Sequence, residues 1–166
     1  VTGSTPDKGV KELAHLVDGQ YGSTKPQDGK WVGFGVEQKT VDLIVDIGNA
    51  EMIQTLGVNV LLNPSAQAEP PLRIQFSLSE DGNTYLPIST TGKEGGEFFT
   101  PEVRSSSIKT MDPQSLLVIV DAGKIAAGKG KGNASAGTKA RYVKVSMTME
   151  THDIYVDEIL VNPIGK

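Results

Sequence analysis

Cysteine is absent from this sequence of 166 residues. Its absence excludes a disulfide scaffold, a thiol nucleophile and thiolate zinc sites together. Histidine is scarce as well, since only His15 and His152 occur, and no serine lies in a G-x-S-x-G motif. A neighbouring pair such as His152-Asp153 is more typical of the entrance to a strand than of a catalytic dyad. The missing chemistry leads us to expect a protein that is not an enzyme.

Long hydrophobic runs are also missing, because no apolar stretch approaches the roughly 20 residues that cross a bilayer. The formal net charge is −4 and the pI is about 5.2. This balance repels phosphate backbones and anionic lipids, so we expect neither nucleic acid nor a membrane as a partner.

What the chain does contain suits a single globular domain over residues 1–166. Hydrophobic residues make up 37% and charged residues 22% of the sequence, which argues against disorder. A chain of this length buries about two-thirds of its unfolded surface and needs no staples. The sequence begins with Val1 rather than methionine and shows no signal peptide, so we expect a module excised from a longer protein.

The clearest periodicity along the chain is two residues, which is typical of half-buried strands. A continuous apolar run at 116–120 predicts a strand buried on both faces. Many short strands without long helical patterns indicate an all-β fold, either an antiparallel sandwich or a barrel. The alternating segments are 41–47, 58–62, 72–78 and 143–149, and a last strand is expected at 154–161.

Turn residues separate these strands. Asp81-Gly82 joins two alternating segments and predicts a hairpin. We expect Ile47-Gly48-Asn49 to end a strand, and only 8–17 has a pattern that suits a short helix.

Two stretches are predicted as loops. Residues 92–100 are rich in glycine and carry adjacent phenylalanines, and 122–139 are rich in glycine, alanine and lysine. The second stretch contains 123–129, which match the phosphate-binding pattern G-x-x-x-x-G-K. A phosphate loop needs Ser or Thr next and then a helix, whereas Gly130 follows here. We interpret the match as accidental, and the sequon at Asn133 matters only in a eukaryotic secretory context.

The segment after Leu16 has the character of a cation-binding loop. Asp18-Gly19 opens an irregular stretch that continues through Gly22, Ser23 and Thr24. A carboxylate followed by exposed carbonyl groups suits calcium, which takes six to eight oxygen ligands. A plain Asp-Gly turn is the alternative interpretation.

Taken in order, these pieces resemble the F5/8 type C (discoidin-like, galactose-binding-like) family. The resemblance spans roughly residues 12 to 162 and is closest to bacterial modules appended to glycan-active enzymes and surface proteins. It rests on seven segments in the family's order: Leu16–Gly19, Trp31–Phe34, Val45–Gly48, Ile53–Leu62, Ser77–Tyr85, Ala140–Val145 and Asp157–Val161.

The resemblance implies a jelly-roll β-sandwich of about eight antiparallel strands. It also implies a structural calcium ion held by the side chains of Asp18 and Glu158, with carbonyl groups near Tyr21, Ser23 and Thr24 as further ligands. Coagulation-factor members close their ends with a disulfide, which this chain cannot form.

The function implied is a non-catalytic carbohydrate-binding module. It would tether a larger extracellular protein, secreted or attached to the cell surface, to a polysaccharide or a cell-surface glycan, with neighbouring domains of the parent protein as further partners. We expect a monomer. One alternative is a structural or protein-interaction sandwich that binds no sugar, and another is a hydrolase with paired carboxylates.

Sugar binding needs an exposed aromatic face and planar polar groups that bond hydroxyls. Aromatic residues make up only 5% of the chain. We expect Trp31 and Phe34 to pack in the core rather than to serve as a platform. The candidate glycan-binding residues are Phe98, Phe99, Arg104, His152 and Tyr21.

Overall fold

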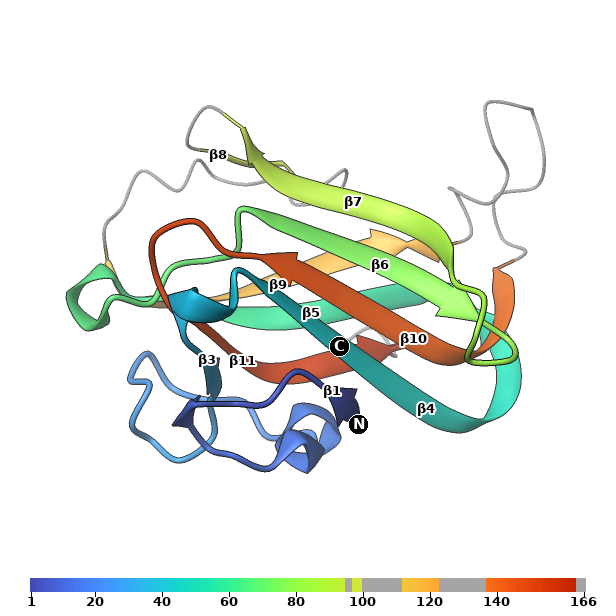
Figure 1. Ribbon diagram of the computed structural model, residues 1–166, viewed down its shortest axis with the longest axis horizontal. Coiled ribbons are helices and arrows are strands. Elements are labelled where there is room, and N and C mark those ends of the chain that lie inside the picture. Colours follow the sequence, from blue (N-terminus) through green and yellow to red (C-terminus); the bar gives the residue numbers. More distant parts are fainter. Residues whose placement is uncertain (95–96, 100–111, 123–136, 164–166) are drawn as a thin grey trace.

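The computed structural model describes residues 1–94, 97–99, 112–122 and 137–163 (Figure 1). In this part of the chain the architecture is an all-β sandwich of two antiparallel sheets, which confirms the expected fold class. The six-stranded sheet has the order β1 (Thr2–Gly3), β4 (Thr40–Ile53), β10 (Thr138–Thr148), β6 (Arg73–Ser79), β7 (Leu86–Glu94) and β8 (Glu97–Phe99).

The five-stranded sheet lies behind it in Figure 1. Three short 3-10 helices, η1 (Leu13–Val17), η2 (Val36–Gln38) and η3 (Pro64–Ala66), complete the described elements, and none of the described helices has the length and apolarity to cross a membrane. The strand order of the five-stranded sheet is β2 (Lys8–Gly9), β3 (Val32–Phe34), β11 (Ile154–Val161), β5 (Thr55–Leu62) and β9 (Gln114–Asp121).

The described strands number eleven, against the expected eight or so. The additional strands are short. β1 and β2 have two residues each and pair with β4 and β3, while β8 has three residues and extends the edge at β7.

The core lies between the two sheets, where alternate side chains of each strand meet. In β4, Val41, Leu43 and Val45 are buried while their neighbours are half-buried or exposed. The same alternation buries inward residues of β6 and β10, because successive side chains of a strand point to opposite faces of the sheet. These inward residues are Ile74, Phe76, Leu78, Val143, Val145 and Met147.

The prediction of a strand buried on both faces at 116–120 was wrong. β9 lies at the edge of its sheet and alternates, with Leu117 40% exposed and Val118 3% exposed. Only one face of an edge strand in a two-layer sandwich meets the core, so its apolar outward residues remain in contact with water.

Two local predictions also need correction. β4 does not end at Gly48 but continues to Ile53, since the residues at 47–50 bulge out between Asp46 and Glu51 in the pairing with β10. The helix expected at 8–17 is a 3-10 turn preceded by the β2 strand.

The two predicted loops are partly strands. Residues 92–94 and 97–99 belong to β7 and β8, while Lys139 belongs to β10 and Ala122 is buried. Residues 123–136, which include the accidental phosphate-loop match and the sequon, lie outside the described residues.

Candidate functional site

One end of the sandwich is built from two connections, residues 63–72 between β5 and β6, and residues 149–153 between β10 and β11. Backbone hydrogen bonds clamp these connections together. The amide of Glu69 donates to the carbonyl of Asp153 at 3.2 Å, and the amide of Asp153 donates to the carbonyl of Gln67 at 3.1 Å. This end therefore has a fixed backbone, although it is made of turns.

The sequence explains the shape of the first connection. The side chain of Asn63 accepts hydrogen bonds from the hydroxyl of Ser65 at 2.6 Å and from the amide of Ala66 at 3.3 Å, which caps η3. Gln67 then adopts a left-handed conformation with φ of 55° and reverses the chain. Asparagine followed by proline suits this tight turn, because proline is tolerated at the first helical position.

A shallow hollow at this end is lined by residues 69–72, 149–152 and Ile154. Nδ1 of His152 lies 3.3 Å from Oε2 of Glu69 and 2.7 Å from the hydroxyl of Thr151. The side chains of His152 and Glu69 are each about one-third exposed. An imidazole and a carboxylate thus stand together at the surface, and both are planar groups that exchange hydrogen bonds with hydroxyls.

The side chain of Asp153 fixes the chain next to His152. One of its carboxylate oxygens accepts a hydrogen bond from the amide of Val36 at 3.0 Å, and the other lies 3.5 Å from the ammonium group of Lys8. The position of His152 is therefore tied to both the amino-terminal strand β2 and η2.

Of the remaining predicted glycan-binding residues, Phe98 and Phe99 lie in β8. The backbone of Phe99 pairs with Gly92 of β7, which pairs with Arg73 of β6, so β8 lies at the same end of the sandwich as His152. Only the backbone of Phe98 and Phe99 is described, and Arg104 lies outside the described residues.

Tyr21 belongs to another surface. It lies in the loop between η1 and β3, is 44% exposed, and has Glu158 and Asp157 as its electrostatic neighbours. Partial burial and these two carboxylates raise the pKa of its hydroxyl. The fold does not bring Tyr21 to the hollow at His152.

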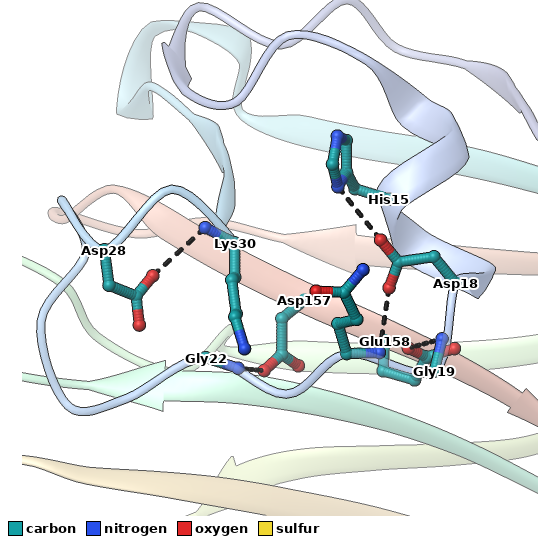
Figure 2. Close-up of polar contacts among 9 residues, drawn as sticks. His15, Asp18, Gly19, Gly22, Asp28, Lys30, Asp157 and Glu158 are labelled. Carbon is teal, nitrogen blue, oxygen red and sulfur yellow. Dashed lines mark hydrogen bonds and ion pairs between the residues drawn. The ribbon is translucent and has the colours of Figure 1, made fainter.

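The loop that contains Tyr21 lies against β11 through two buried carboxylates (Figure 2). The amide of Gly19 donates to Oε2 of Glu158 at 2.9 Å, and the amide of Gly22 donates to Oδ2 of Asp157 at 2.6 Å. The side chain of Asn59 donates to the other oxygen of Asp157 at 2.8 Å. The loop is thus held to the sheet by its own backbone amides.

Asp157 and Glu158 are consecutive residues, yet they are 0% and 3% exposed. The register of β11 against β5 shifts between Val156 and Glu158, so Asp157 is the extra residue of a bulge. These two carboxylates are shielded from water because the loop covers the side of β11 that would otherwise be exposed.

The electrostatics of this contact reflect crowded negative charge. Burial, together with the nearby charges of Asp18 and Asp157, raises the pKa of Glu158 to about 7. Burial also raises the pKa of Asp157, even though the amide of Gly22 and the side chain of Asn59 donate to it.

The predicted calcium ligands are partly brought together. Asp18 and Glu158 lie on either side of Gly19, and Asp18 also accepts from the amide of Gln20 at 2.8 Å and faces Nδ1 of His15 at 3.0 Å. Among the described residues, no group of three or more histidine or acidic side chains is arranged to hold a metal ion.

The carbonyl groups named as further ligands face side-chain donors. The indole of Trp31 donates to the carbonyl of Ser23, and the amide side chain of Asn63 donates to the carbonyl of Thr24, each at 2.9 Å. Farther along the loop, the carboxylate of Asp28 accepts from the amides of Ser23 and Lys30.

Trp31 and Phe34 are fully buried, which confirms that they pack in the interior. Trp31 forms a small cluster with Leu61, Ala68 and Tyr155 between the loop and the sheet. A methyl group added at Gly22 would come within 2.3 Å of the indole nitrogen of Trp31. Glycine is required at this point because the chain passes directly over the ring.

Comparison with known proteins gave no matching family model and no match among curated protein sequences. Solved structures do match. The C-terminal domain of a chitobiase from Bacteroides fragilis has a TM-score of 0.53 at 15% identity, over 98% of this chain and 90% of that chain. A carbohydrate-binding module from Clostridium perfringens, in complex with GalNAc-β-1,3-galactose, has a TM-score of 0.55 at 15% identity, over 96% and 91%.

A fucose-binding module from Streptococcus pneumoniae has a TM-score of 0.54 at 11% identity, over 99% of this chain and 93% of that chain. The chain has the discoidin-like fold. At these identities the similarity establishes the fold alone, and the discoidin-like fold confirms the architecture that the ordered motifs implied.

Proposed function

We propose that this protein is a non-catalytic carbohydrate-binding module whose glycan site includes His152 and Glu69. The observation that carries the proposal is the imidazole–carboxylate pair at 3.3 Å on a clamped end of a discoidin-like sandwich. Structures with the same fold include modules that bind GalNAc-β-1,3-galactose and fucose.

The recognition chemistry follows from the two side chains. A carboxylate at Glu69 accepts hydrogen bonds from sugar hydroxyls, and the Nε2 atom of His152 exchanges one, because Nδ1 faces Glu69 and Thr151. Pro70 is half-buried at the edge of the same hollow and offers apolar surface beside the pair. The fixed backbone lowers the entropic cost of binding, since little is left to order.

The absence of catalysis is part of the proposal. Hydrolysis of a glycosidic bond generally needs two carboxyl groups about 5 to 10 Å apart across an accessible cleft. The carboxyl group of Glu158, whose pKa is raised to about 7, lies under the loop and accepts a hydrogen bond from the amide of Gly19. This arrangement supports a structural role for Glu158.

We also propose an extracellular location and a role in tethering a parent protein to its glycan. The affinity of a single module would be modest. Tandem copies in a parent protein would raise the affinity through effective concentration. An alternative remains a sandwich that contacts neighbouring domains and binds no sugar.

A calcium ion at Asp18 and Glu158 is the second part of the proposal. Burial, together with the nearby charges of Asp18 and Asp157, raises the pKa of Glu158, and a bound cation would offset that clustering of negative charge. Each carbonyl oxygen has two lone pairs, so the carbonyls of Ser23 and Thr24 keep the capacity for a second partner. The ion would hold the loop to β11.

A glycan array on the whole chain, followed by titration calorimetry with each hit, tests the glycan proposal. We expect His152→Ala and Glu69→Gln to weaken binding at least tenfold. His15→Ala is the matched control, because His15 lies beside Asp18 and has a similar exposed fraction. Absence of binding to plant, bacterial-wall and animal glycans, or equal loss in the His15→Ala variant, would contradict the proposal.

A further inference from the structure

A second hollow lies at the opposite end of β6, where the β6–β7 turn meets the first residues of β10. Its volume is about 290 Å³. Small-molecule sites begin at roughly 300 Å³, so the hollow has room for a ligand of about one ring. Its walls include Leu78, Leu86, Glu80, Asp81, Thr138 and Lys139.

The hollow has an exposed apolar wall. Leu86 is 58% exposed, whereas Leu78, its partner across β6 and β7, is 2% exposed and belongs to the core. A ligand that covers Leu86 with an apolar face would remove this surface from water, which is favourable.

The hollow also has an unsatisfied hydroxyl. Oγ1 of Thr138 is buried and has no hydrogen-bond partner among the described residues. Buried polar side-chain atoms without a partner are unusual in folded proteins. A change of Thr138 to another staggered χ1 rotamer would be needed to turn this hydroxyl toward a ligand hydroxyl, which would supply the partner.

Charged groups of both signs lie at the rim of the hollow. The ammonium group of Lys139 lies 3.9 Å from the carboxylate of Glu80, and both side chains are more than half exposed. A loose, exposed pair of this kind keeps donors and acceptors open to a ligand and contributes little to stability. Because Asp81 also lines the hollow, two carboxylates stand against one ammonium group, and this excess of negative charge disfavours an anionic ligand.

The turn beside this pair is rigid. The carboxylate of Asp81 accepts hydrogen bonds from the hydroxyl of Ser79 at 3.0 Å and from the amides of Asn83 and Thr84 at 2.8 and 2.9 Å. The hydroxyl of Ser79 accepts from the amide of Gly82 at 2.9 Å. This wall of the hollow is therefore formed before any ligand arrives.

We propose that this hollow is a second saccharide subsite, which takes one uncharged, hydroxyl-rich sugar unit with its apolar face on Leu86. The ligand class rests on the proposed function, but the location does not. The seven residues of β6 separate the two ends, a distance of about 20 Å at roughly 3.3 Å per residue. A polysaccharide that engages both ends would gain affinity through effective concentration.

Chemical-shift mapping of the whole chain tests the subsite, with fucose and GalNAc-β-1,3-galactose as probes. We expect a saturable set of shifts at Leu86, Thr138 and Lys139, separate from the set at His152. Leu86→Ala and Thr138→Val should weaken the first set at least fivefold and leave the second unchanged. Thr138→Val should not lower the melting temperature, because it removes an unpartnered hydroxyl without changing the shape.

Leu117→Ala is the matched control, since Leu117 is 40% exposed on the other sheet. Loss of the set at Leu86 in this variant would overturn the subsite. Shifts confined to the His152 end would overturn the subsite and leave the proposed function standing. Shifts confined to the hollow would support the subsite and contradict the proposed site at His152, and no shifts at either end would contradict both.

Discussion

The amide of Gly19 and the carboxylate of Glu158 are joined by a hydrogen bond of 2.9 Å across a sequence separation of 139 residues. This bond attaches the loop after η1 to the central part of β11. Because Glu158 is buried and lies near Asp18 and Asp157, we expect the same contact to make the stability of the protein depend on pH and, under the calcium proposal, on cations.

In metal-free protein, the stability should rise as the pH falls from about 8 to 5.5. The folded pKa of Glu158, about 7, lies above its ordinary value of 4.5, so the folded state binds the proton more tightly than the unfolded state. Thermal melts over this pH range in chelator check the prediction. Glu158→Gln should remove most of the slope and Glu69→Gln should not, and equal slopes in wild type and Glu158→Gln would contradict it.

Calcium should raise the melting temperature of the wild-type protein, and a chelator should reverse the change. A ligand that binds only the folded state stabilises it by mass action. Asp18→Asn and Glu158→Gln should abolish the response, whereas Asp112→Asn, which alters an exposed acid in the segment before β9, should keep it. An unchanged melting temperature in metal-loaded wild type after chelation would count against the ion.

Asp157→Ala should destabilise the fold by about 2–4 kcal/mol, because it leaves the buried side-chain amide of Asn59 and the half-buried backbone amide of Gly22 without their acceptor. Urea denaturation gives the free energy of unfolding. Asp112→Ala is the control for loss of one acidic residue and should change that free energy by less than about 0.5 kcal/mol. An equally small change in the free energy of unfolding for Asp157→Ala would show that the hydrogen bonds at the bulge do not stabilise the fold.

Gly22→Ala should destabilise the protein by about 1–3 kcal/mol through collision with the indole of Trp31. In a Trp31→Phe background the ring is smaller and the added methyl group has more room. The cost of Gly22→Ala should therefore be smaller in that background, and a double-mutant cycle measures the difference. Additive costs would indicate that the two residues are not in contact in solution.

The strands could be predicted from alternation because each has one face in the core. The predicted segment at 72–78 agrees with β6 to within one residue at each end. In contrast, β9 could not be distinguished from a central strand, because an edge position is a property of the sheet and not of Leu116 or Leu117. The bulge at Asp157 could not be predicted from the sequence either, because a register shift depends on the partner strand.

The candidate site was predictable only in part for a related reason. His152 was nominated from its chemistry, and Asp18 and Glu158 from the family resemblance. Glu69 was missed because nothing in its own turn marks it, and its importance arises from the pairing of that turn with the backbone of Asp153. Side chains that meet across two turns leave no local pattern in a sequence.

The hydrogen bonds between Gln67, Glu69 and Asp153 also bear on how fast a ligand binds and leaves. A surface that is already in its binding shape needs no slow rearrangement before contact. Association at this end should therefore be governed by diffusion and orientation, and the ranking of glycans should appear almost entirely in their residence times.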